Sequence, residues 1–302
     1  MTNANELVSI VVTTKNEERT IGRCLESIKL QSYPNIQLIV VDNHSTDATQ
    51  DIARTFTSMV YSWGPERSAQ RNFGLLQQAS GSIGGYIDAD MILGPEVVAQ
   101  SVALLNSGCV GVYVPEIVIG RSAWIPARNF ERSFYDGTPV DAVRFFHMDA
   151  FRAVSGFDEE LFRSGSGEDW DLDIALQATG RLCSLTRHGP TAQNWELSDY
   201  VTALGARSVL SSAIFHDEDD FRLSEFLRKK RYYATGFDGY REKHGVAHPR
   251  LKYQFSPWNR SLGIFVSRGK LRLTLRHPLL SIQALSLRFM MGLSTKLARL
   301  RS

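Results

Sequence analysis

Asp88 and Asp90 stand one residue apart at the end of a short apolar run. Two carboxylates with this spacing at the end of a strand can both reach forward once the chain leaves the sheet. Oxygen ligands of this kind suit Mg²⁺ or Mn²⁺, and a diphosphate binds beside such a metal. The chain contains four Asp-x-Asp pairs. The residues around this pair must therefore decide whether it forms a site.

A second pair of carboxylates, Glu168 and Asp169, stands where a Gly/Ser run at 164–167 meets a helical pattern. Acidic side chains are stabilised at a helix N-terminus by the exposed backbone N–H groups, so this pair needs no function to be there. A carboxylate within hydrogen-bond reach of a hydroxyl can also remove its proton. Both interpretations stay open from the residues alone. Asp171 and Asp173, further along the helix, are predicted to face solvent.

The elements before the first pair predict an α/β fold. Apolar, β-branched runs at 7–14 and 36–41 indicate buried parallel strands, and helical patterns follow them at 20–31 and 48–56. In a doubly wound sheet, ligands bind at the carboxyl ends of the strands. The first strand is not followed by the G-x-G-x-x-G of a dinucleotide dehydrogenase. The polar residues at this edge, which are candidates for holding a nucleoside, are Thr14, Lys15, Asn16, Glu17 and Asp42.

Two arginines, Arg67 and Arg71, lie one helical turn apart in the segment that returns the chain to the sheet. A guanidinium on that face could reach a diphosphate or a uracil carbonyl, whereas the simpler interpretation is a pair of solvated arginines. A later apolar run at 109–119 predicts one more strand, in the same sheet or at its edge. Residues 120–140 predict an amphipathic helix and a loop, with acceptor contacts as an alternative role.

The composition is that of a globular enzyme with an uneven distribution of charge. The 302 residues are 43% hydrophobic, which is enough for a substantial core. The formal net charge is +2, yet the last acidic residue is Glu242 and residues 243–302 hold 12 Lys and Arg. The earlier part holds 22 basic residues against 32 acidic ones. A basic tail implies an anionic partner, which could be nucleic acid, anionic lipid or an acidic face of the same protein.

The three cysteines, Cys24, Cys109 and Cys183, are far apart in the sequence. Their spacing excludes a CxxC metal knuckle and gives no indication of a disulfide framework, so a reducing compartment is expected. The first residues lack the pattern of a signal peptide, and no run is long and apolar enough for a spanning helix. A cytoplasmic protein, peripheral on the inner face of the membrane if the tail binds lipid, is the resulting expectation.

The order of these motifs resembles that of the family 2 inverting glycosyltransferases of the GT-A fold. The first-strand segment, the Asp42 turn, the Arg71 helix and the Asp-x-Asp occur in the same order as in that family, and the resemblance covers about residues 7–240. Two later segments, at 144–159 and 164–172, extend it. The four motifs that carry the resemblance are VSIVVTTKNE at 8–17, IVVDNHSTD at 39–47, AQRNFG at 69–74 and YIDAD at 86–90.

The resemblance implies roles for particular residues. Asp90 would be a direct ligand of Mn²⁺ or Mg²⁺, with Asp88 nearer the ribose and the metal-bound waters, and His216 would complete the metal shell. Asp169 would be the catalytic base, while Glu168 and Trp170 would contact the acceptor. The edge residues after the first two strands would hold the nucleoside. The remaining candidates for donor binding, on the basis of their cationic or polar side chains, are Arg71, Arg228 and Tyr232.

The tail from Pro257 interleaves apolar and basic residues. After Pro278, Arg288 and Lys296 recur near the helical period, opposite Ile282, Phe289 and Leu293. This pattern is typical of an amphipathic helix that lies on an anionic membrane, and a helix packed on the acidic part of the chain or on a dimer partner explains it as well. The expected organisation is a GT-A catalytic domain at 1–220, with a nucleotide-sugar half at 1–100 and an acceptor half at 101–220, and a basic helical region at 221–302.

The sequence therefore predicts metal-dependent, inverting transfer from a UDP-sugar to an acceptor hydroxyl. A lipid-linked glycan or glycolipid of surface polysaccharide assembly is the expected acceptor. A nucleotidyltransferase is an alternative, but its Gly-rich triphosphate loop is not visible after Val12. A non-catalytic nucleic-acid-binding protein would explain the basic tail and leave the carboxylates Asp42, Asp88, Asp90 and Asp169 without a role. The donor sugar and the oligomeric state are not indicated.

Overall fold

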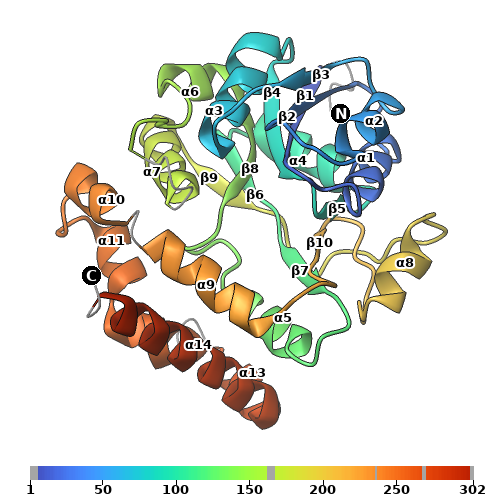
Figure 1. Cartoon of the computed structure of the whole chain (residues 1–302). Helices are drawn as coiled ribbons and strands as arrows, with labels where there is room; N and C mark the ends of the chain where they lie inside the picture. The colour runs from blue at the N-terminus through green and yellow to red at the C-terminus, as the bar shows by residue number, and fades with distance from the viewer. Residues whose placement is uncertain (1–5, 162–166, 235–236, 267–269, 300–302) are drawn as a thin grey trace.

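The structure is a computed structural model that describes residues 6–161, 167–234, 237–266 and 270–299. Positions 164–166 of the predicted Gly/Ser run lie outside these residues. Strands and helices alternate through the first half of the chain, and the last part is helical (Figure 1). The strands are β1 Val8–Thr14, β2 Ile36–Asp42, β3 Val60–Ser62, β4 Ile83–Asp88, β5 Met91–Leu93, β6 Gly111–Tyr113, β7 Glu116–Ile119, β8 Val143–His147, β9 Leu182–Ser184 and β10 Ile214–Asp217.

The helices cover the strands and build the C-terminal region. They are α1 Ile21–Lys29, α2 Thr49–Arg54, α3 Arg67–Asn72, α4 Val97–Asn106, α5 Ile125–Arg132, α6 Met148–Ala153, α7 Glu168–Thr179, α8 Ser198–Ala203, α9 Leu223–Ala234, α10 Phe237–His244, α11 Pro249–Phe255, α12 Ile264–Val266, α13 Leu271–Arg276 and α14 Pro278–Arg299, with π-helical turns η1 Phe73–Gln78 and η2 Asn259–Gly263.

A seven-stranded sheet forms the centre of the fold, in the order β3-β2-β1-β4-β8-β6-β9. Strands β1 to β4 are parallel, whereas β8 runs antiparallel to both β4 and β6. All seven residues of β1 are buried, because a central parallel strand is covered by helices on both faces. This arrangement confirms the prediction of a mixed, mainly parallel sheet flanked by helices.

The predicted strand at 109–119 is two strands in two sheets. β6 pairs with β8 and β9 in the large sheet, whereas β7 joins a separate three-stranded sheet in the order β5-β10-β7. Pro115 lies between them and has no backbone N–H to donate to a ladder, so the continuous apolar run is broken there. The prediction of one strand was wrong for this reason.

Cys109 and Cys183 form a disulfide, with their Cα atoms 6.0 Å apart. The two residues are 74 positions apart in sequence, but β6 and β9 are parallel neighbours and Val112 is paired with Cys183 in register. The bond was not expected from the spacing of the cysteines, because only the pairing of β6 with β9 brings them together. Cys24 is a free, buried thiol.

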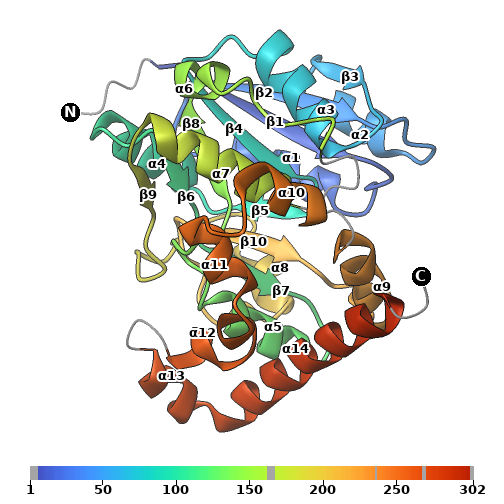
Figure 2. The ribbon, with the colours of Figure 1, turned by 90° about the vertical axis from the view of Figure 1, so that its left-hand side faces the viewer.

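The C-terminal helix α14 packs against α5 and α9. Figure 2 shows α14 running beneath α5 and ending beside α9, and residue contacts join α14 to both helices. Phe130 and Phe134, from α5 and the turn after it, pack with Phe265 and with Ala284 of α14 in one buried cluster. The region predicted as an amphipathic helix therefore turns its aromatic side chains inward. Among the described residues, no helix is both long enough and apolar enough to cross a bilayer.

Candidate active site

Asp88 and Asp90 lie at the junction of the two sheets. β4 ends at Asp88 in the large sheet, and β5 of the small sheet begins at Met91. Asp88 is in register with Thr13 of β1, so the pair lies at the carboxyl edge of the parallel strands, as predicted. A pocket of about 1280 Å³ opens at this edge and extends beneath it to the C-terminal helices. Its volume is larger than that of a typical small-molecule site, which leaves room for two substrates.

His216 lies next to Asp90 because β10 pairs with β5. His216 is opposite Met91 in the antiparallel register, and its Nε2 lies 3.1 Å from Asp90 Oδ2. Burial alone would lower the pKa of His216, but the carboxylates of Asp90 and Glu116 raise it to about 10. Without a metal the imidazole is therefore protonated and paired with Asp90.

The Asp90–His216 pair fits a divalent cation. Asp90 Oδ1 is buried without a hydrogen-bond partner in the described part of the chain, so this oxygen is available as a ligand. A carboxylate and an imidazole are acceptable to Mn²⁺, and Mg²⁺ sites commonly use one or two carboxylates plus substrate phosphates. Three or more His, Cys, Asp or Glu side chains arranged for a metal are not found among the described residues. Any ion here would therefore need donor phosphate oxygens or water.

Asp88 is engaged by arginines. Arg71 Nη2 donates to Asp88 Oδ1 at 3.0 Å, and Arg144 Nη1 lies 3.7 Å from Oδ2. Burial alone would raise the pKa of Asp88, but these two guanidinium groups hold it well below its usual value. The Asp88 carboxylate is thus ionised and fixed in orientation. Its side chain remains 22% exposed at the pocket.

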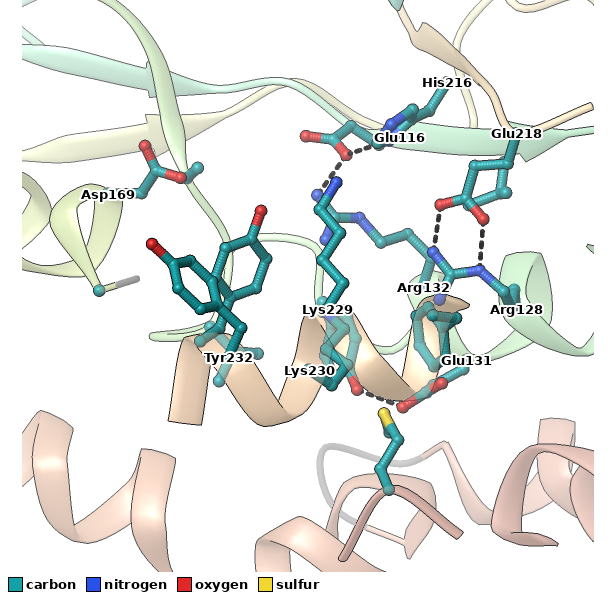
Figure 3. A pocket seen from close by; sticks show the side chains of 18 of the residues that line it. Glu116, Arg128, Glu131, Arg132, Asp169, His216, Glu218, Lys229, Lys230 and Tyr232 are labelled. Carbon is teal, nitrogen blue, oxygen red and sulfur yellow. Dashed lines mark hydrogen bonds and ion pairs between the residues drawn. The ribbon is translucent and has the colours of Figure 1, made fainter. Parts of the chain in front are cut away.

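Asp169 is held by Arg71, whose other guanidinium nitrogen contacts Asp88. Arg71 Nη1 and the Tyr86 hydroxyl both donate to Asp169 Oδ1, each at 2.9 Å. Asp169 is in the first turn of α7, and its side chain is 28% exposed and lines the pocket. In the described structure no contact engages Oδ2, so one carboxylate oxygen can act on a substrate. Figure 3 shows Asp169 and His216 on different sides of the pocket.

Glu168 and Trp170 line the pocket beside Asp169. Glu168 is buried and pairs with Arg67 at 3.0 Å, and its burial raises the pKa of its carboxyl group. The Trp170 ring stacks on Phe237 of α10, with the ring centroids 5.2 Å apart. Both side chains therefore brace the start of α7, and their contact with an acceptor stays a prediction.

Asp171 and Asp173 do not face solvent, and this prediction was wrong. Asp171 pairs with Lys243 Nζ at 2.9 Å and with His244 Nε2 at 2.6 Å, both from α10. Asp173 is fully buried and accepts a hydrogen bond from the backbone N–H of Val143 at 3.1 Å. A helix at the surface would expose these positions, but α7 is covered on one side by β8 and on another by α10.

The residues predicted to hold the nucleoside lie at the ends of β1 and β2. Asn16 joins the two loops: its backbone N–H donates to Ser45 Oγ at 2.7 Å, and its side-chain oxygen accepts from Thr46 N at 2.9 Å. Asp42 is buried and accepts from Ser45 N and Gln50 Nε2. Thr14 is buried with an unpartnered hydroxyl in the described structure, and Lys15 is exposed.

The pocket unites some of the predicted site residues and leaves others outside it. Thr14, Lys15, Asn16, Asp42 and Arg71 do not line it. Arg71 is completely buried behind it, neither solvated nor open to a diphosphate. Arg228 and the 58% exposed Tyr232 line the side formed by α9. The predicted residues that line the pocket are Glu17, Asp88, Asp90, Glu168, Asp169, Trp170, His216, Arg228 and Tyr232.

Two buried charged residues at the pocket, Glu116 and Arg144, were missed in the sequence. Glu116, the first residue of β7, pairs with Arg132 of α5 and with Arg144 of β8, whose Nη2 lies 2.8 Å from Glu116 Oε1. Burial alone would raise the pKa of Glu116, but the two arginines keep it well below its usual value. The only signal was a single acidic residue inside an apolar run, which is costly unless it is paired.

The comparisons with known proteins agree with this arrangement. The family model described as "Glycosyl transferase family 2" matches residues 9–159, which include both strands of the nucleoside edge, Arg71 and the Asp88–Asp90 pair. The chain belongs to glycosyltransferase family 2. This is the family that the motifs predicted, and the fold is the predicted GT-A fold.

Known proteins resemble this family 2 chain over part or all of its length, and the chain spans a third or less of the first curated relatives that it matches. Glycosyltransferase AglE of Haloferax volcanii is 33% identical over 99 residues, which cover 30% of this chain and only 32% of AglE. A mannosyltransferase of Pyrobaculum calidifontis, PcManGT, solved with GDP-Man and Mn²⁺, superposes with a TM-score of 0.61 at 16% identity, over 98% of this chain and 89% of its own. S. aureus TarS 1–349, solved with UDP-GlcNAc, gives 0.52 at 17% identity, over 94% and 81%.

Proposed function

We propose that this family 2 glycosyltransferase moves a sugar, with inversion, from a nucleotide-sugar donor to an acceptor hydroxyl in a metal-dependent reaction. The observation that carries the proposal is the shared pocket of Asp90, His216 and Asp169. One side offers an unpartnered carboxylate oxygen beside an imidazole, and the other offers a carboxylate with one free oxygen. A cation site and a general base are the two groups that this reaction needs.

Asp90 and His216 would hold the cation, with Asp88 oriented next to them by Arg71 and Arg144. When bound, Mn²⁺ or Mg²⁺ would neutralise charge on the leaving diphosphate. Arg228 and Tyr232 of α9 line the same pocket and would stabilise the departing nucleoside diphosphate further. The structures with GDP-Man and UDP-GlcNAc belong to other proteins, so the nucleoside is to be tested; UDP is the donor nucleotide that we propose.

Asp169 would accept the proton of the acceptor hydroxyl. The acceptor oxygen forms a bond to the anomeric carbon, the bond from that carbon to the diphosphate oxygen breaks, and the proton passes to Asp169. Attack from the face opposite the leaving group inverts the configuration. Arg71 and Tyr86 fix Oδ1 and leave Oδ2 for the substrate, so the base is oriented before the acceptor arrives.

We propose a lipid-linked glycan or glycolipid as the acceptor. The support comes from α14: its inner face, including Met291 and Lys296, lines the pocket, while Leu279, Ile282 and Phe289 are 61% to 80% exposed on its outer face. An apolar surface within a basic segment suits the anionic lipids of the cytoplasmic leaflet. A lipid-linked acceptor could then enter the pocket from the membrane surface.

Donor binding and turnover test the proposal together. Calorimetry with UDP, and in parallel GDP, with and without Mn²⁺, should show metal-dependent binding that Asp90→Ala abolishes. Asp149→Ala is the matched control, because Asp149 is a fully exposed carboxylate outside the pocket. A screen of UDP-sugars for UDP release then identifies the donor. Equal nucleotide affinity of Asp90→Ala and wild type in Mn²⁺ would reject the metal role.

A further inference from the structure

Glu116 lies on the same face of the small sheet as His216. In the parallel register of β7 and β10, Glu116 is opposite Ile214 and Val118 is opposite His216. Since alternate residues of a strand share a face, Glu116 and His216 point to the same side, and both line the pocket. Figure 3 shows the two side chains next to each other at the edge of the small sheet.

The two nitrogens of the His216 ring face different carboxylates. Nε2 lies 3.1 Å from Asp90 Oδ2, on the side of the proposed cation, and Nδ1 lies 3.8 Å from Glu116 Oε2. A histidine that binds a metal through one nitrogen usually donates its other N–H to a carboxylate, a carbonyl or water, which sets the tautomer and the ring orientation. Glu116 occupies the place of such a partner.

Glu116 is itself held from two sides. Arg132 of α5 pairs with Oε2, and Arg144 of β8 donates to Oε1 at 2.8 Å. Glu116 is 3% exposed. Two arginines from different elements therefore keep Glu116 against the His216 ring and prevent it from swinging out to bind a cation directly.

We propose that Glu116 is a positioning residue that orients the His216 imidazole for the divalent cation. This inference rests on the metal role of Asp90 and His216 proposed above. At 3.8 Å the contact between Nδ1 and Oε2 is electrostatic, and Glu116 would accept from Nδ1–H if Nε2 held the cation. Arg132 and Arg144 make this orientation rigid, so His216 presents Nε2 without reorganising its ring.

The test compares two buried glutamates that both neutralise arginines. Glu131 of α5 also lines the pocket, is 6% exposed and accepts from Arg288 at 2.7 Å, but it does not contact His216. Mn²⁺ binding is measured in the presence of UDP by the electron paramagnetic resonance signal of free Mn²⁺, which requires no turnover. We expect Glu116→Gln to lower Mn²⁺ affinity by about 10- to 100-fold, and Glu131→Gln to leave it within about twofold of wild type.

A second measurement reports which nitrogen of the His216 ring carries the proton. In the Mg²⁺- and UDP-bound protein, ¹⁵N chemical shifts of His216 should show a proton on Nδ1 and none on Nε2, and Glu116→Gln should weaken this preference. Glu116→Asp, which keeps the charge, should restore part of the Mn²⁺ affinity even if Glu116→Gln lowers the melting temperature.

The outcomes separate this inference from the proposed function. Glu116→Gln and Glu131→Gln binding Mn²⁺ equally well, while Asp90→Ala binds none, would overturn the role of Glu116 and leave the metal site intact. A proton on Nε2 of His216 in the Mg²⁺-bound protein would overturn it too. If wild type and Asp90→Ala bind Mn²⁺ alike, the metal site itself is rejected, and the role of Glu116 with it.

Discussion

At the scale of single residues, the completely buried guanidinium of Arg71 connects the two halves of the proposed chemistry. It contacts Asp88, which ends β4, and Asp169, in the first turn of α7. A buried charge is tolerated only when it is paired and hydrogen-bonded, so Arg71 and its two carboxylates depend on one another. One side chain thereby links Asp88 of the Asp-x-Asp pair to the candidate base Asp169.

Replacement of the candidate base tests its role directly. Asp169→Asn keeps the shape of the side chain and an oxygen that can accept from Tyr86, but it cannot take up a proton from the acceptor. We expect kcat to fall by about 10²- to 10⁴-fold, with UDP and Mn²⁺ affinity close to wild type. Near-normal turnover of this variant, measured by UDP release, would show that another group is the base.

At the scale of elements, α14 has two different faces. Ala284 and Leu287 are buried, whereas the side chains predicted to form its apolar stripe, Ile282, Phe289 and Leu293, are exposed. The helix therefore packs on the protein through one face, as one interpretation of the tail predicted, and leaves an apolar surface on the other. The membrane interpretation stays a prediction. Removing the whole helix would uncover the aromatic cluster of α5, so point substitutions are the better test of membrane contact.

Two substitutions on the outer face should weaken membrane binding. Ile282→Ser with Phe289→Ser removes apolar area from side chains that are 61% and 71% exposed, so the fold should remain stable. We expect reduced flotation with vesicles that contain anionic lipid. Val246→Ser is the control, because Val246 is 74% exposed and lies on a turn outside α14. Unchanged flotation of the double variant would remove the membrane proposal.

At the scale of the whole molecule, the pocket is built from both ends of the chain. Residues before position 220 supply the carboxylates and His216, and α9 to α14 supply the opposite side. The stability of this assembly should depend on pH through Asp141, a buried residue in the segment between α5 and β8. Burial raises the pKa of Asp141 to about 7, with Arg132 opposing the shift and Glu116 adding to it.

The sign of the pH effect follows from that raised pKa. The folded state holds the Asp141 proton more tightly than the unfolded chain does. The contribution of protonated Asp141 to the free energy of unfolding is therefore fully present below about pH 4 and is lost as the pH rises to about 7. Asp141→Asn removes this loss of stability, because the asparagine side chain does not titrate. Relative to wild type, the free energy of unfolding of Asp141→Asn should increase by at most about 1.4 kcal/mol per pH unit in that window.

Urea denaturation between pH 4 and 8 measures this difference. Asp149→Asn, at a fully exposed carboxylate, is the control for removing one negative charge. A difference between Asp141→Asn and wild type that stays constant with pH would contradict the assignment.

The sequence by itself determined the fold class and the edge at which the site lies. Apolar runs such as 7–14 can only be buried strands, and polar residues directly after parallel strands must meet at one edge, so Asp42, Asp88 and Asp90 were placed correctly from local pattern. The nearness of His216 to Asp90 was predicted from the resemblance and agrees with the pairing of β5 with β10.

Only the tertiary structure decided which charges are buried and what they pair with. Arg71, Asp171 and Glu116 carry no local signal of their partners. Those partners come from α7, α10, α5 and β8 and lie between 16 and 98 positions away in the sequence. The disulfide and the division of 109–119 into two strands have the same origin. Burial and pairing of charge depend on contacts between distant elements, whereas strand and helix patterns depend on neighbours in sequence.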